Sequence, residues 1–225
     1  MTDLCFVADL GSQNQIDFTK LAATSWNGIK CEGVILRATR SNCLPDPLFA
    51  ARADAGGKAG FLVGAYAFNT GETAQIQADR FLAVTKPFGG ILRALDYETN
   101  PGGRQMSLTS CVEFLDRVAQ ATGHRCWLYS GDRIKSLIVT ATEAQRQEIS
   151  LSLYWGCEYG PVFKDVDDNG HPLPWDAPTL WQDTGDGLGP QPHTLAGLEQ
   201  GADLSIFKGT RDQLATVWAG PAMTP

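Results

Sequence analysis

Short apolar runs alternate with segments of helical length along most of this chain, and this alternation is the feature that most limits its fold. Runs of strand length, rich in β-branched or aromatic residues, occupy residues 4–9, 33–39, 61–68, 91–98 and 125–129. Between them we expect helices over about 16–26, 46–55, 73–84 and 110–122. Strands that alternate with helices predict a parallel sheet with helices on its outside.

The pattern becomes irregular after residue 129. We expect short helices over 134–137 and 142–148, short strands over 150–155, 179–182 and 203–207, and a final helix over 211–218. The late strands lack long helices between them. The fold class is therefore α/β, and we expect a modified TIM-like β/α barrel that is regular in its first five βα units and irregular in its last three strands. We expect one domain over residues 1–225, with its core over about 4–218 and a short C-terminal tail.

Carboxylates follow two of the predicted strands. The run that begins at Ile91 ends in Asp96 and Glu98, and the first run ends in Asp9. Residues i and i+2 of a strand point to the same face, so Asp96 and Glu98 would project together with Cα atoms about 6.5 Å apart. Such acids at the carboxyl edge of a barrel form an active site. The alternative is a strand that ends in an acidic surface loop.

Composition excludes several classes of protein. The 25 acidic residues outnumber the 18 basic ones, which gives a net charge of -7, and no Lys/Arg run suggests a nucleic-acid surface. We find neither a membrane-span-length apolar stretch nor an export signal, and we expect no membrane partner. The six cysteines are dispersed without a CxxC, so we expect reduced core thiols, no metal and no cofactor.

An acidic segment over residues 165–176 resembles a calcium loop. Asp165, Asp167, Asn169 and Asp176 fall at positions 1, 3, 5 and 12 of an EF-hand-like pattern. Two prolines inside the segment and the lack of flanking helices oppose this hypothesis. We therefore expect a solvated acidic insertion, with calcium binding as the alternative.

A series of short motifs runs along the chain from about Leu4 to Gly209: Asp9, Arg37-Ala38-Thr39, Asp46-Pro47-Leu48-Phe49, Gly64-Ala65-Tyr66, Leu95-Asp96-Tyr97-Glu98, Leu128-Tyr129, Trp155 to Tyr159, Trp181-Gln182 and Ala202-Asp203. In this order, the motifs resemble those of glycoside hydrolase family 25 lysozymes. The resemblance implies a cleft at the strand C-termini. It also implies a muramidase that cleaves the β-1,4 bond between N-acetylmuramic acid and N-acetylglucosamine of peptidoglycan, with retention.

The resemblance implies a role for each of four acids. Glu98 matches the proton donor, Asp96 matches the acid that assists the 2-acetamido group, and Asp9 and Asp203 match two further cleft acids. Bond cleavage needs a proton for the leaving group and negative charge near the anomeric carbon, which two carboxyl groups in different ionisation states supply. Clustered carboxylates raise one another's pKa, so one of them can stay protonated.

Other residues would contact the sugar. Tyr66, Tyr129, Trp155, Tyr159 and Trp181 lie near predicted strand ends, where their rings stack on sugars or fill the core. We add Gln182 and Arg37 to the substrate-binding set; Arg37 either pairs with the cleft acids or extends along the surface. Ala67 and Arg40 depart from the pattern of the family at positions that should line the cleft.

The biological setting is an expectation only. Peptidoglycan glycan strands are the expected partner of a monomeric enzyme. Without a signal peptide, we expect a phage endolysin that stays in the host cytoplasm until it is released to the wall, or a protein secreted by a non-classical route. Two other functions stay open: a glycan-binding barrel with little activity, and a chitin-type glycosidase of similar fold.

Overall fold

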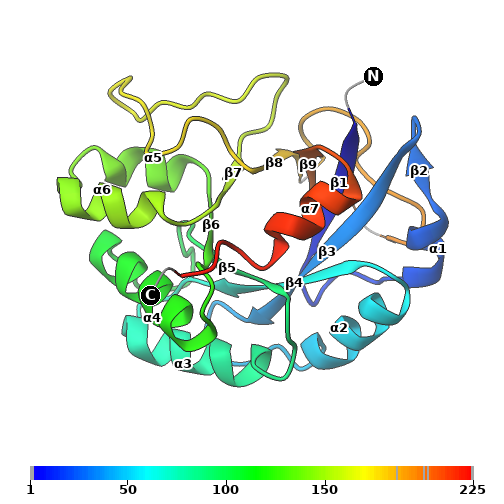
Figure 1. Cartoon of the computed structure of the whole chain (residues 1–225), viewed down its shortest axis with the longest axis horizontal. Coiled ribbons are helices and arrows are strands. Elements are labelled where there is room, and N and C mark those ends of the chain that lie inside the picture. The colour runs from blue at the N-terminus through cyan, green and yellow to red at the C-terminus, as the bar shows by residue number, and fades with distance from the viewer. Residues whose placement is uncertain (1–2, 186, 200, 202, 224–225) are drawn as a thin grey trace.

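A closed barrel of eight strands forms the centre of the molecule (Figure 1). The computed structural model describes residues 3–185, 187–199, 201 and 203–223; Ala202, named above beside Asp203, lies outside them. The barrel strands are β1 (Leu4–Leu10), β3 (Ile29–Thr39), β4 (Leu62–Phe68), β5 (Leu92–Asp96), β6 (Trp127–Ser130), β7 (Tyr154–Cys157), β8 (Leu180–Thr184) and β9 (Asp203–Lys208). The pairing of β1 with β3 closes the ring.

The strands from β1 to β8 run parallel around the barrel, and β9 runs antiparallel to both of its neighbours, β8 and β1. This reversal has a direct consequence for the site. The first residue of β9 lies at the edge where the other strands end. Asp203 therefore reaches the carboxyl edge from the first residue of its strand, whereas Asp9 and Asp96 reach it from strand ends.

Helices follow the first five barrel strands and become sparse afterwards, as predicted. They are α1 (Phe18–Ala23), α2 (Phe49–Lys58), α3 (Ala74–Thr85), α4 (Leu108–Thr122), α5 (Asp132–Ile138), α6 (Glu143–Ser150) and α7 (Arg211–Trp218). In Figure 1 the yellow connection before β8 and the orange one before β9 run as loops. The described parts of these two connections contain no helix, so the outer face of β8 and β9 has only loop cover.

The first predicted helix was too long. It ends at Ala23, and the chain then forms a hairpin of β2 (Ser25–Trp26) with the start of β3. Asn27 and Gly28 make the turn with φ of 51° and 82°. An Asn-Gly pair between strands favours this left-handed turn, so the signal was present in the sequence.

Two predicted helix starts were also displaced. Helix α4 begins at Leu108, two residues before the expected start at residue 110, because the side chain of Ser107 accepts the N–H of Ser110 at 3.1 Å. Helix α2 begins at Phe49 instead of residue 46; the Asp46 carboxylate accepts the N–H of Leu48 and pairs with Arg37. With these two partners, the Asp46 side chain fixes the segment before the helix and does not cap its first turn.

The amino-terminal end of the barrel is closed by α7, drawn in red in Figure 1. Trp218 is buried there and donates from Nε1 to the carbonyl oxygen of Val63 at 2.7 Å. Its ring fills the space beside Gly33, where an added Cβ would lie 2.7 Å from a ring carbon. Packing at this end leaves the carboxyl end of the barrel for the site.

The segment 165–176 folds as a small turn. Val166 bridges to Pro172, and the Asp167 carboxylate accepts the N–H groups of Asn169 and His171, each at 2.9 Å. Asp165 and Asp176 line a pocket on the outside of the barrel. Across the described part of the chain, no group of three or more His, Cys, Asp or Glu side chains is placed to hold a metal ion.

Candidate active site

Four acids from distant parts of the chain line one cavity of about 190 Å³ at the carboxyl end of the barrel: Asp9, Asp96, Glu98 and Asp203. A second cavity of about 440 Å³ shares Asp9, Gln13, Tyr66 and Asp203 with the first. The two cavities therefore belong to one polar cleft. Carboxyl ends of barrel strands converge in this way because all of them meet at the same rim.

Asp9 and Asp203 face each other across a strand pair. They are direct partners in the antiparallel register of β1 and β9. Directly opposed residues of such a pair have Cβ atoms about 5 Å apart. Two carboxylates this close repel each other unless one of them holds a proton or a cation lies between them.

Glu98 lies beyond the end of β5, which stops at Asp96. The strand alternation that predicted a shared face for Asp96 and Glu98 therefore does not extend to Glu98. Hydrogen bonds hold the segment instead. Asn69 donates from Nδ2 to the carbonyl oxygens of Asp96 at 3.1 Å and Glu98 at 2.8 Å, and its own N–H donates to Asp96 at 3.0 Å.

The peptide between the two acids is held from the other side. The N–H of Tyr97 donates to the carbonyl oxygen of Tyr129 at 2.9 Å, and Ser130 Oγ donates to that of Tyr97 at 2.7 Å. Asn69 and Ser130 are both fully buried. A buried clamp of this kind fixes the direction in which Glu98 leaves the backbone, so Glu98 still reaches the cavity of Asp96.

Burial and mutual repulsion keep protons in the cluster. Burial, followed by the charge of Asp203, raises the pKa of Asp9 well above its usual value. Burial and then the charge of Glu98 do the same to the pKa of Asp96, and Arg37 opposes this shift. Among the described residues, Asp9 Oδ2 and Asp96 Oδ1 are buried without a hydrogen-bond donor. The cluster can therefore hold a transferable proton near neutral pH.

Arg37 lines the cavity but pairs elsewhere. Its Nε lies 3.1 Å from Asp46 Oδ2, and its guanidinium also donates to Ser12 Oγ. Of the two predicted alternatives, a pair with the cleft acids and a surface-extended side chain, the structure adopts neither. The guanidinium acts on Asp96 through its charge, as a fixed positive group at the wall of the cavity.

Three predicted aromatic residues, Tyr66, Tyr129 and Trp155, form the floor of the cavity. Trp155 is 2% exposed and donates from Nε1 to Ser205 Oγ at 2.8 Å. Tyr129 packs edge-on against it, with ring centroids 4.5 Å apart. Because so little of its ring is exposed, Trp155 supports the cavity from below and has no free ring face on which a sugar could stack. The two tyrosines place their hydroxyl groups near the acids.

Tyr159 and Gln182 approach Asp203 around Gly185. A Cβ added at Gly185 would lie 2.6 Å from Tyr159 Oη, 2.7 Å from Asp203 Oδ1 and 3.0 Å from Gln182 Nε2. A Cβ this close would force the ends of these side chains to move apart, so glycine at this position lets the three groups converge. Gly185 is a functional candidate that the sequence motifs missed.

Trp181 lies on the other side of its strand from Gln182. Side chains alternate along β8, so Gln182 turns toward the barrel interior and Trp181 outward. The indole Nε1 donates to the carbonyl oxygen of Glu158 at 2.8 Å, and the ring lines a separate outer pocket. The structure thus does not bring Trp181 to the acids with the other predicted contacts.

Ala67 and Arg40 are likewise absent from the lining of the two cleft cavities. Tyr66 and Phe68 line the acid cavity, and Ala67 between them faces the core between strands and helices. The expectation that both positions line the cleft was wrong. Alternation along β4 turns Ala67 to the opposite face, and Arg40 lies beyond the end of β3, in a turn held by its backbone hydrogen bonds with Leu44 and Cys43. Gln13 and Phe68 line the cavity without having been singled out, since neither residue type carries a chemical signal of its own.

Cys157 is a further residue near the acids that sequence patterns did not predict. Burial raises the pKa of its thiol to about 12, while hydrogen bonds from Tyr129 and Tyr159 act in the opposite direction. The thiol is therefore protonated near neutral pH. It serves as a packing group between the two tyrosines and not as a nucleophile.

Comparisons with known proteins agree with this geometry. The family model described as Glycosyl hydrolases family 25 matches residues 9–188. The chain is 26% identical over 222 residues to the uncharacterized protein YegX of Escherichia coli O157:H7, covering 95% of this chain and 72% of that protein.

Solved structures share the fold. The bacterial lysozyme of Streptomyces coelicolor superposes with a TM-score of 0.74 at 20% identity, over 95% of this chain and 96% of the other. A family 25 lysozyme from Aspergillus fumigatus also gives 0.74, at 21% identity, over 96% of this chain and all of the other. The spore cortex lytic enzyme SleM of Clostridium perfringens gives 0.73 at 25% identity, over 92% of this chain and 68% of the other.

Proposed function

Because the chain belongs to glycosyl hydrolase family 25, we propose that it is an N-acetylmuramidase that cleaves the β-1,4 bond between N-acetylmuramic acid and N-acetylglucosamine in peptidoglycan. One observation carries the proposal: Asp9, Asp96, Glu98 and Asp203 line a single cavity at the end of the barrel where active sites lie. The names of its structural relatives, which include lysozymes and endolysin catalytic domains, support the same substrate.

In the first step, Glu98 donates its proton to the glycosidic oxygen. The bond from the anomeric carbon to that oxygen breaks, and the electron pair stays on the departing sugar. The carbonyl oxygen of the substrate's 2-acetamido group then bonds to the anomeric carbon, which forms a cyclic intermediate. Asp96 accepts the acetamido N–H and stabilises the positive charge that develops.

In the second step, Glu98 acts as a base and takes a proton from water. The water oxygen bonds to the anomeric carbon on the face from which the first sugar left, and the acetamido ring reopens. Two inversions leave the configuration retained. Glu98 regains the proton that it lost, so the enzyme returns to its starting state.

The protein contributes charge and orientation to both steps. The pKa of Asp96 is raised in the free protein by burial and then by Glu98, and Arg37 and the substrate N–H both favour its ionised form. Substrate binding would thus move the proton of the cluster toward Glu98, where it is needed. An ionised carboxylate of the Asp9–Asp203 pair adds negative charge beside the cationic transition state.

A turbidity assay on isolated bacterial cell walls tests the proposal. We expect the purified chain to clear the walls and release reducing ends at N-acetylmuramic acid, with chitin a poor substrate. Absence of clearing would support a glycan-binding barrel instead. Faster hydrolysis of chitin than of cell walls would identify chitin as the substrate in place of peptidoglycan. A glycosyl ester trapped on Asp96 would contradict the acetamido-assisted mechanism.

A further inference from the structure

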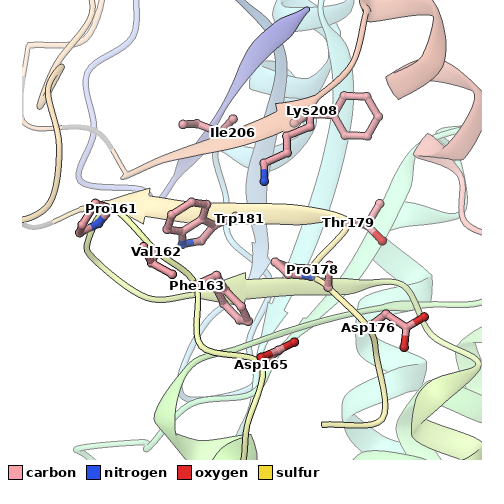
Figure 2. A pocket seen from close by; sticks show the side chains of 12 residues that line it. Pro161, Val162, Phe163, Asp165, Asp176, Pro178, Thr179, Trp181, Ile206 and Lys208 are labelled. Carbon is pink, nitrogen blue, oxygen red and sulfur yellow. The ribbon is translucent and has the colours of Figure 1, made fainter. Parts of the chain in front are cut away.

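A second cavity lies apart from the acid cleft. It is a pocket of about 510 Å³ on the outside of the barrel, between β8, β9 and the loop that follows β7. Figure 2 shows Trp181 at its centre, with Ile206 and Lys208 on one side and Phe163 on the other. We call it the outer pocket. Its volume is within the range of sites that bind small ligands, about 300–1,000 Å³.

The outer pocket exists because the last strands lack covering helices. In a regular barrel, a helix would pack on the outer face of β8, where Trp181 and Ile206 of neighbouring β9 are register partners. Here the loop over residues 158–179 reaches that face, and its Val162 remains 67% exposed at the rim. Apolar side chains thus stay accessible on a sheet face that is normally covered.

The aromatic wall is held in one orientation. The Trp181 indole donates to Glu158, and its ring meets Phe163 edge-on with centroids 6.1 Å apart. Phe163 in turn packs against Tyr154, and the Lys135 ammonium lies 5.2 Å from the centre of its ring. A ring fixed by contacts outside the pocket loses little freedom when a ligand stacks on it.

Charged groups lie around the aromatic wall. Asp165 and Asp176, from the loop before β8, line the pocket together with Lys208 of β9 (Figure 2). A pyranose ring has apolar C–H faces that stack on an indole, and a rim of hydroxyls that bond to carboxylates and ammonium groups. The methyl group of an N-acetyl substituent would suit the apolar part of the wall.

We propose that the outer pocket is a second binding site for N-acetylhexosamine units of a glycan strand, separate from the site of cleavage. The inference rests on the proposed function and deepens it. One short segment joins the two sites: Tyr159 approaches Asp203 in the cleft, and Pro161 to Phe163 line the outer pocket. The second site holds an insoluble wall against the enzyme while the cleft engages a strand.

The test compares an insoluble polymer with a short soluble substrate. We assay the variants Trp181→Ala and Val162→Asp on cell walls and on a soluble tetrasaccharide fragment of peptidoglycan. Wall binding is measured by co-sedimentation in a Glu98→Gln background. Leu151→Asp is the matched control, because Leu151 is also exposed, at 43%, but does not line the pocket. Val162→Asp keeps the test independent of any folding defect in Trp181→Ala.

We expect both pocket variants to bind walls about tenfold more weakly and to clear them more slowly, with unchanged turnover of the soluble fragment. Leu151→Asp should match the parent protein. Unchanged wall binding in Val162→Asp and Trp181→Ala, or an equal loss on both substrates, would overturn the proposal. If the parent protein binds walls through the pocket but cleaves neither substrate, the muramidase function fails while the second site stands.

Discussion

The two halves of the barrel use the same strand geometry differently. From β1 to β6, helices cover the outer faces of the strands, and the interior faces deliver Asp9, Arg37, Tyr66, Asp96 and Tyr129 to the cleft. From β7 to β9 the described connections contain no helix, and both faces of β8 carry candidate functional residues: Gln182 approaches Asp203, and Trp181 lines the outer pocket. Covered strands present one functional face, whereas uncovered strands present two.

The largest expected effect is a difference in turnover between variants of Glu98, in the regular half of the barrel (β1 to β6), and of Glu158, in the irregular half (β7 to β9). Glu98→Gln removes the transferable proton, so turnover of cell walls should fall by a factor of about 10³ or more. Glu158→Gln should leave turnover within about twofold, because Glu158 pairs with Lys135 at 2.7 Å and does not line the acid cavity. Loss of this largely buried ion pair should lower the thermal unfolding midpoint instead. Initial clearing rates with matched circular dichroism spectra measure both. Comparable losses in the two variants would contradict the assignment of the cleft.

The clamp behind Glu98 gives the next effect. Asn69→Leu keeps the size of the side chain but removes both donors to the carbonyls of Asp96 and Glu98. A small displacement of Glu98 should lower kcat about tenfold to a hundredfold and leave KM nearly unchanged. The thermal unfolding midpoint will also fall, because the carbonyl oxygen of Glu98 loses this donor and that of Asp96 keeps only the backbone N–H of residue 69. A change in KM alone would show that Asn69 affects substrate binding instead of the direction of Glu98.

A methyl group at the turn after β8 should have a moderate effect. Gly185→Ala places Cβ less than 3 Å from Tyr159 Oη and Asp203 Oδ1, so these groups must separate. We expect kcat/KM to fall about tenfold. Gly57→Ala in α2 is the matched control, since nothing lies within 4 Å of its Cβ, and it should raise stability by about 0.5–1 kcal/mol without changing activity. Equal activity in the two variants would mean that the cleft tolerates this displacement.

The smallest effect concerns stability and pH. The pKa of Asp9 is raised above its unfolded value, so this group stabilises the fold below its unfolded pKa, and that contribution is lost as pH rises through the folded pKa. Asp9→Asn should therefore raise the free energy of unfolding at pH 7, with a smaller gain at pH 4. Urea unfolding at the two pH values measures this difference.

Asp167 of the irregular half should show the opposite sign. Burial tends to raise its pKa, but the N–H groups of His171 and Asn169 outweigh that effect and lower it. Its contribution is present above the unfolded pKa and is lost as pH falls through the folded pKa. Asp167→Asn should therefore destabilise the protein at pH 7 and have less effect at low pH. If Asp167→Asn were more stable than the parent protein at pH 7, the opposite signs predicted for Asp167 and Asp9 would be contradicted.

Several parts of the fold and site followed from local patterns. Apolar runs predicted the barrel strands, and Thr73, Thr142 and Thr210 cap helices close to the predicted starts. Asp9 and Asp96 at strand ends predicted acids at the barrel rim. Helical periodicity over 16–26 predicted too long a helix, although Asn27-Gly28 is a turn signal. The direction of β9 could not be predicted, because it depends on the partner strands.

The sequence by itself determined which residues could do chemistry: the acids, the aromatic residues and their order along alternating strands and helices. Tertiary structure decided where each one points. Antiparallel pairing of β9 set Asp203 opposite Asp9, and side chains from neighbouring strands, not strand alternation, directed Glu98 into the cavity. Trp181 points outward from β8, and because no helix covers that face, it forms the wall of a second pocket instead of a cleft contact. Hydrophobic periodicity is local, whereas strand direction and burial depend on contacts between segments far apart in the chain.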